Sequence, residues 1–153
     1  MINEPIQSFI IHSRAFGETS MIFDLLTLQN GIISVIIKGA KKRKDSGHLH
    51  VAKEFDMYIS KAKLPMVVKY EVSHSYLIKK KHLLIILYFN ELLLRLVPKS
   101  QPQKSLYSFY KKYLAYMTKT EDADNSIVIG FEVLLLKNIG YAISTQLDIH
   151  KIR

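Results

Sequence analysis

The chain has 153 residues, of which 48% are hydrophobic, enough for the core of one compact domain or two small ones. Lysine and arginine number 22 against 13 acidic residues, so the formal net charge is +9. Such an excess favours association with nucleic acid or another anionic surface. Cysteine is absent, which excludes disulfides and thiolate zinc sites and fits a reducing, cytoplasmic setting.

The first 14 residues include Glu4 and lack both a basic start and a long apolar stretch, so we expect no secretory signal. The most apolar run, residues 83–97, is interrupted by Glu91 and Arg95 and is shorter than the about 20 residues that a membrane helix needs. We therefore expect a soluble protein with a buried helix at 83–97 and no membrane partner.

Up to about residue 78, the patterns are those of β-strands. Five segments are β-branched or alternate between apolar and polar residues, at 6–13, 21–28, 32–38, 54–60 and 66–78. Asn30-Gly31 separates the second segment from the third and tolerates the positive φ of a tight hairpin. In the fifth segment, strict alternation places one set of residues on a single face: Met66, Val68, Tyr70, Val72, His74 and Tyr76.

Five strands in fewer than 80 residues are too few for a two-layer sandwich. A small barrel is the economical arrangement because closure removes exposed strand edges. We predict a five-stranded barrel of the OB type, with an SH3-like barrel as the alternative.

After residue 80 the apolar period becomes helical. Within 102–119, one stripe contains Leu106, Phe109, Tyr110, Tyr113, Leu114 and Met117. Ser100 is the predicted N-cap of this helix, with Gln103 as its capping-box partner. A preceding helix at about 82–96 ends before Pro98, and a third at about 124–138 stops at Gly140. The fold class is thus α+β, with an OB-fold domain at 1–78 and a small helical domain at 79–153.

Signatures of catalysis and nucleotide binding are missing, so we expect neither an enzyme nor a cofactor. His48 and His50 could share one side of a strand. Without cysteines or a nearby carboxylate pair, they are interpreted as loop histidines, and no metal site is predicted.

One loop, residues 38–44, concentrates positive charge in Lys38, Lys41, Lys42, Arg43 and Lys44. A loop with this many cations must lie in water, where it can contact phosphates. Three further cations extend this surface if the barrel brings their loops together: Arg14, Lys61 and Lys63. Tyr58 is a candidate for stacking on bases, whereas Tyr70 is expected in the core.

Three ordered segments resemble the RecO family of bacterial recombination mediators. Residues 11–45 contain SRAFGETS, a hairpin with glycine at the turn, and KGAKKRKD; residues 87–114 begin LYFNELLLRL; and residues 131–141 read FEVLLLKNIGY. The motif FGETS within the first segment is interpreted as a structural turn around Gly17.

The resemblance implies an OB-fold followed by a helical domain and a non-catalytic role in DNA repair. It implies binding of single- and double-stranded DNA, annealing of complementary strands, and assistance to RecA loading on DNA coated by single-strand-binding protein (SSB). Implied partners are RecR and the acidic C-terminal tail of SSB. The implied location is cytoplasmic and nucleoid-associated.

Family members are commonly longer and many carry a cysteine cluster after the G-Y element, so this chain is expected to be a shortened member or a fragment. An acidic tail ending in apolar residues needs a cationic rim beside a hydrophobic groove. Candidate rim residues in the helical half are Lys79, Lys80, Lys81, Arg95, Lys111 and Lys112.

Two other functions remain open from the residues alone. One is an adaptor in which the basic surface binds acidic protein tails. The other is an OB-type RNA-binding protein.

Overall fold

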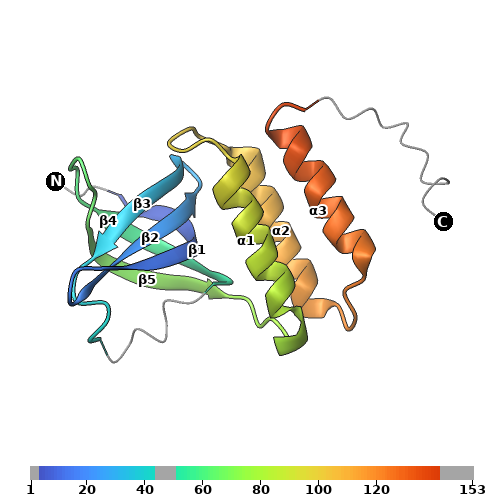
Figure 1. The fold of residues 1–153 in the computed structure, drawn as a ribbon, viewed down its shortest axis with the longest axis horizontal. Helices are drawn as coiled ribbons and strands as arrows, with labels where there is room; N and C mark the ends of the chain where they lie inside the picture. The colour runs from blue at the N-terminus through green and yellow to red at the C-terminus, as the bar shows by residue number, and fades with distance from the viewer. Residues whose placement is uncertain (1–3, 44–50, 142–153) are drawn as a thin grey trace.

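The computed structural model describes residues 4–43 and 51–141, which form a five-stranded antiparallel sheet followed by helices (Figure 1). The strands are β1 (Ile6–Phe16), β2 (Ser20–Thr27), β3 (Gly31–Ile37), β4 (Lys53–Ile59) and β5 (Val67–Ser75). A short 3-10 turn, η2 (Lys80–His82), leads into α1 (Leu83–Leu96), which is followed by α2 (Lys104–Lys119) and α3 (Asn125–Asn138). The predicted fold class is confirmed.

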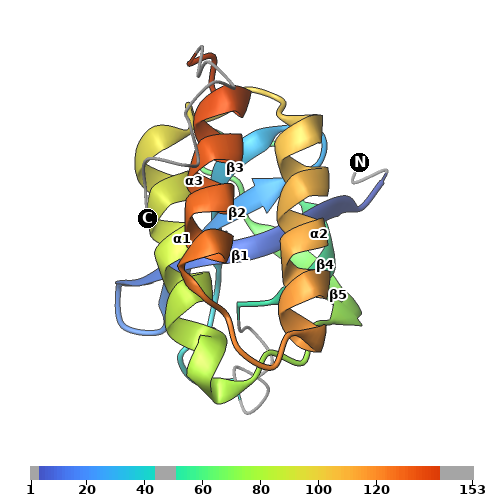
Figure 2. The same ribbon diagram turned by 90° about the vertical axis from the view of Figure 1, so that its right-hand side faces the viewer.

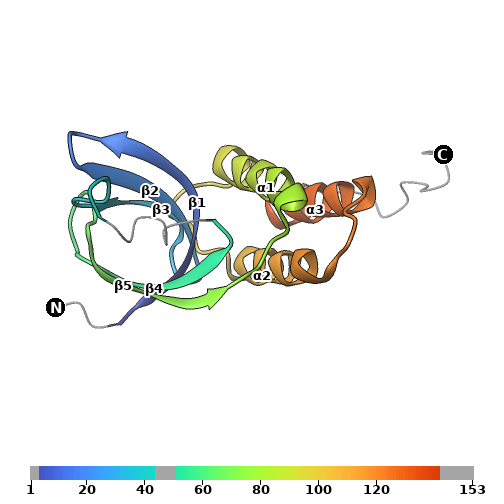
Figure 3. The same ribbon diagram turned by 90° about the horizontal axis from the view of Figure 1, so that it is seen from below.

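The sheet curls into a barrel, as Figure 3 shows. Its strand order is β3-β2-β1-β4-β5, so β1 pairs with both β2 and β4. The two outer strands approach each other where Ile36 forms a parallel bridge with Met66 and donates its backbone N–H to the Pro65 carbonyl at 2.9 Å. This closure is the OB-type arrangement.

Two hydrophobic cores lie on opposite sides of the sheet. The barrel interior contains Ile10, Phe23, Leu25, Val35, Ile37, Ala40, Phe55 and Met57. The outer surface contributes Phe9, Ile11, Leu26 and Ile32 to a second core shared with all three helices. The barrel and the helices are therefore joined by one continuous apolar layer.

The helices form a small bundle against the barrel. Figures 2 and 3 show α1 and α2 next to the sheet and α3 on their far side. Phe131 of α3 stacks on Phe89 of α1, with ring centroids 3.8 Å apart. None of the described helices is long and apolar enough to cross a membrane.

The predicted end of α3 is confirmed, but the predicted N-cap of α2 is wrong. Gly140 follows α3 with φ of +98°, and Asp124 caps its start by accepting from the Ser126 backbone N–H at 2.9 Å. The α2 helix begins after Gln103, not after Ser100. Ser100 instead has φ of +59° and donates its N–H to the Ile32 carbonyl, because the segment after α1 runs beside β3.

The predicted shared face of β5 is wrong at Val68 and again beyond Val72. The β4–β5 ladder pairs Ile59 with Val67 but Tyr58 with Lys69, so one residue is added to β5 between these pairs. This bulge leaves Val68 61% exposed, while Val67 packs against the barrel core. Beyond Val72, a second bulge pairs His74 with Glu54, and Tyr76 lies in the core shared with the helices, not in the barrel interior. An alternating sequence pattern cannot predict a bulge, because the added residue depends on the pairing with the neighbouring strand.

A buried carboxylate ties the barrel to α2. Glu54 of β4 is 4% exposed and accepts a hydrogen bond from the Tyr107 hydroxyl at 2.7 Å. Lys111 places its Nζ 3.0 Å from the second carboxylate oxygen. Burial, and then the bond to Glu54, raise the pKa of Tyr107, so its proton stays available for donation. Tyr107 lies outside the predicted stripe, yet it is buried, with its ring centroid 5.1 Å from that of Phe9.

Replacing Gly31 tests the contact between the hairpin and the segment after α1. Gly31 has φ of +69°, and a Cβ there would lie 1.9 Å from the Gln101 carbonyl oxygen. Gly39 has the same φ but open space around it. We expect Gly31→Ala to lower the free energy of unfolding by about 1–3 kcal/mol more than Gly39→Ala, since both share the backbone strain and only one overpacks. Urea unfolding measures the difference, and equal losses would contradict the contact.

Removing the Lys111 cation tests the tie between β4 and α2. We expect Lys111→Ala to destabilise the fold by about 1–2 kcal/mol, less than the 3–5 typical of a fully buried pair because Lys111 is 47% exposed. The adjacent Lys112→Ala is the control, with an expected change within about 0.5 kcal/mol. Adding Glu54→Gln to Lys111→Ala should recover part of the loss. A double variant less stable than Lys111→Ala alone would refute this account.

Candidate nucleic-acid interface

The loop after β3 is folded against the turn between β1 and β2. Gly39 adopts φ of +69°, and the Lys42 N–H bonds to the Gly39 carbonyl at 3.0 Å. Lys41 donates its backbone N–H to Thr19 at 3.0 Å and its Nζ to the Gly17 carbonyl at 2.7 Å. Two strand connections far apart in sequence are thereby joined at one end of the barrel.

Burial of Ala40 explains why the charges of this loop face outward. Ala40 is fully buried in the barrel core and fixes the loop between the cations on either side. Lys38, Lys42 and Arg43 are exposed, and none of them forms an ion pair within the described residues. Lys44 lies outside the described residues. We call the surface formed by Lys38, Lys41, Lys42 and Arg43 the basic loop.

The predicted role of Gly17 as a turn residue is confirmed by its φ of +63°. Its carbonyl is the acceptor for Lys41, so the turn supports the basic loop. His48 and His50 lie outside the described residues. Within the ranges that are described, no group of three or more potential ligands lies close enough to hold a metal ion.

Arg14 is not an independent surface cation. Its Nη1 lies 2.8 Å from Oδ2 of Asp24, a β2 carboxylate that is 1% exposed. Burial by itself would raise the pKa of Asp24, but hydrogen bonds from Ser34 and His12, together with the Lys99 and Arg14 charges, hold that pKa below its ordinary value. Asp24 is therefore ionised at neutral pH.

The structure separates the two tyrosines considered for stacking. Tyr70 packs against the barrel core, with its ring centroid 6.1 Å from that of Phe55. Tyr58 is half-buried and has the Lys69 Nζ 5.4 Å from its ring centroid, a cation–π distance. The ring of Tyr58 is thus already covered in part by a cation.

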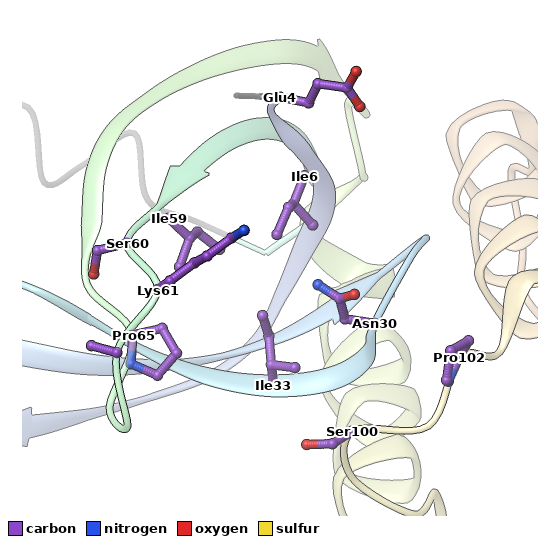
Figure 4. A pocket seen from close by; sticks show the side chains of 11 residues that line it. Glu4, Ile6, Asn30, Ile33, Ile59, Ser60, Lys61, Pro65, Ser100 and Pro102 are labelled. Atoms are coloured by element: carbon purple, nitrogen blue, oxygen red, sulfur yellow. The ribbon is translucent and has the colours of Figure 1, made fainter. Parts of the chain in front are cut away.

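The loop between β4 and β5 places Lys61 and Lys63 differently from the basic loop. Lys61 lines a hollow of about 580 Å³ at the mouth of the barrel. Figure 4 shows its side chain beside Ile6, Ile33 and Ile59, which form the apolar wall. This hollow lies near the start of β3, whereas the basic loop follows its end. In the loop between β4 and β5, the Pro65 carbonyl accepts the Ile36 N–H of β3. Lys61 and Lys63 therefore lie on a segment that runs along β3.

Most of the candidate rim residues in the helical half already have acidic partners. Lys79 pairs with Glu121, Lys81 with Asp122 at 2.7 Å, Arg95 with Glu91, and Lys111 with Glu54. Lys80 and Lys112 have no ion pair among the described residues. Lys112 lines a groove of about 410 Å³ between α2 and α3, together with Tyr113, Tyr116, Ser126 and Ile127.

Lys99 is a cation that the sequence patterns did not single out. It precedes Ser100 in the segment that runs beside β3, and its Nζ lies 3.7 Å from Asp24 Oδ1. No local signal marks it, because its position depends on the packing of the helices against the barrel.

Comparison with known proteins identifies the family. The model "Recombination protein O N terminal" matches residues 1–76, and "Recombination protein O C terminal" matches residues 81–150. Curated relatives named DNA repair protein RecO include those of Cellvibrio japonicus (30% identical over 94% of this chain), Nitrosospira multiformis (31% over 95%) and Haemophilus influenzae strain 86-028NP (29% over 94%). The chain spans 62% of the length of each of these three relatives. Matches in the same order along both halves show that this chain belongs to the RecO family.

Proposed function

We propose that the chain is a non-catalytic DNA repair mediator that binds single- and double-stranded DNA through the basic loop. The observation that carries this proposal is the outward display of Lys38, Lys42 and Arg43 on a loop fixed by Ala40 and Lys41. Cations without acidic partners can exchange their counterions for DNA phosphates, which is the main source of sequence-independent affinity. The names of the relatives support the repair role.

Annealing of complementary strands follows from the same property. It requires no bond chemistry, only that two anionic strands are held close with their repulsion screened. We extend the proposal to assisted loading of RecA on SSB-coated DNA together with RecR, in a cytoplasmic, nucleoid-associated setting. In this scheme residues 1–78 supply the main DNA contacts, and the surface for protein partners lies within residues 79–153.

The groove between α2 and α3 favours one such partner. Tyr113, Tyr116 and Ile127 line it together with the cation of Lys112. An acidic peptide ending in apolar residues matches this combination, because the apolar end fills the groove while the carboxylates meet the cation. We propose that it receives the C-terminal tail of SSB.

The DNA proposal is tested by fluorescence anisotropy on a labelled single-stranded oligonucleotide across a salt series. Lys38/Lys42/Arg43→Ala leaves the anchor Lys41 in place and should lower the slope of log affinity against log salt by about two, at roughly 0.7 per lost phosphate contact. The control Lys104/Lys119/Lys137→Ala removes the same charge from exposed helix positions and should change the slope little. Equal effects of the two variants would mean that only net charge matters, and an unchanged slope in the first would remove the loop from the site.

The groove proposal is tested with a labelled peptide of the SSB tail. Lys112→Ala should weaken binding about 1.4- to fivefold, as expected for an exposed charge pair worth 0.2–1 kcal/mol. Tyr116→Ala should weaken it further by removing an apolar wall, whereas Lys119→Ala, exposed on the same helix, should have little effect. Identical affinities for all four proteins would place the tail elsewhere.

A further inference from the structure

A buried carboxylate on the outer surface of the barrel is contacted by donors from the two neighbouring strands, β1 and β3. Asp24 sits in the middle of β2 and is 1% exposed. Its Oδ1 accepts a hydrogen bond from the Ser34 hydroxyl of β3. Its Oδ2 lies 2.8 Å from Arg14 Nη1 and 3.1 Å from His12 Nδ1, both on β1. Each of these groups is thereby held in a defined place on the surface.

The helical half adds a fourth donor, Lys99, to this cluster. Ile32 of β3 forms a bridge with Lys99 and accepts the Ser100 N–H at 2.9 Å. That pairing sets the Lys99 Nζ 3.7 Å from Asp24 Oδ1. The cluster of His12, Arg14, Asp24, Ser34 and Lys99 therefore spans the junction between the barrel and the segment joining α1 to α2.

The charges of this cluster do not cancel. Asp24 supplies one negative charge, while Arg14 and Lys99 supply two positive charges, which leaves a net charge of +1 before any protonation of His12. The carboxylate is buried, but the side chains of Arg14, Lys99 and His12 are 47%, 53% and 41% exposed. A guanidinium has five N–H donors and an ammonium three, so most of the donors of Arg14 and Lys99 have no acceptor among the described residues.

Besides neutralising Asp24, this arrangement holds cationic donors ready for an outside anion. A buried anion that holds several half-exposed donors in fixed positions reduces the ordering cost when an outside anion binds them. The basic loop lies at the Ser20 end of β2, because Lys41 bonds to the Thr19 carbonyl, and Asp24 to Ser20 along β2 is about 13 Å at 3.3 Å per residue. That distance corresponds to a few nucleotide steps of a DNA strand.

We propose that Arg14, Lys99 and His12, positioned by Asp24, form a phosphate-binding site for the nucleic-acid backbone. The inference rests on the proposed DNA binding and extends it, since the bound strand then runs from the basic loop over β1–β3 to the segment between α1 and α2. Arg14 and Lys99 touch the phosphate; Asp24 is a positioning residue.

Lys99→Ala is the first test, because its loss leaves Asp24 paired with Arg14, His12 and Ser34. In the salt series it should lower the slope for single-stranded DNA by about 0.7, one phosphate contact. Lys104→Ala removes the same charge from the start of α2 and should leave the slope unchanged. Equal slopes for Lys99→Ala and the unsubstituted chain would overturn the proposal, while loss of binding in the basic-loop variant would still leave the proposed function standing.

The variant Asp24→Asn distinguishes the positioning role of Asp24 from the effect of net charge on DNA binding. It raises the net charge by one, so a purely electrostatic surface would bind DNA more tightly. A site that depends on Asp24 for its geometry should bind several-fold more weakly, and circular dichroism verifies that the variant is folded. Tighter binding by the folded variant would refute the positioning role.

An NMR titration with inorganic phosphate tests phosphate binding at this cluster in the absence of DNA. The imidazole resonances of His12 should move on addition of phosphate in the unsubstituted chain and move less in Lys99→Ala. If the chain bound no DNA but this shift appeared, the proposed function would fail and the phosphate site would stand. Unmoved His12 resonances would overturn the site.

Discussion

Burial of β2 on both faces is the constraint on which the rest of the structure depends. Phe23 and Leu25 face the barrel interior, whereas Leu26 points outward into the core shared with the helices. A strand that is apolar on both sides cannot leave one side in water without losing the hydrophobic stabilisation of that side, about 25 cal/mol for each Å² exposed. Helices α1 and α2 supply the covering layer, so the barrel and the bundle stabilise each other.

The same covering layer determines where buried charge is neutralised. Asp24 and Glu54 both lie on the outer surface of the sheet, and each is nearly inaccessible to solvent. An unpaired buried carboxylate is costly, so each needs cations. The segment after α1 provides Lys99 and α2 provides Lys111, which means that residues from the helical half complete polar sites that begin in the barrel.

Local patterns in the sequence predicted the elements but not the contacts between them. Apolar period and turn residues indicated the five strands, the three helices, the positive φ of Gly31 and the helix stop at Gly140. Local patterns failed where contact with a segment distant in sequence determines the conformation of a residue. A bulge opposite β4 turns Val68 outward, and pairing with β3 draws Ser100 away from the start of α2. The ion pairs of Lys99 and Lys111 depend on carboxylates distant in sequence.

The positive charge of the chain therefore divides into two groups with different physical effects. Cations such as Arg14 and Lys111 are held by buried acids, although the half-exposed Arg14 keeps open donors. Those of the basic loop other than Lys41 have no protein acceptor within the described residues. All of them contribute to the long-range field that attracts a polyanion and speeds its association. Only cations with open donors can replace a counterion at a phosphate, so the salt dependence of binding reports the arrangement of donors and not the net charge. A sequence gives the sum of charges, and the fold decides which of them remain available.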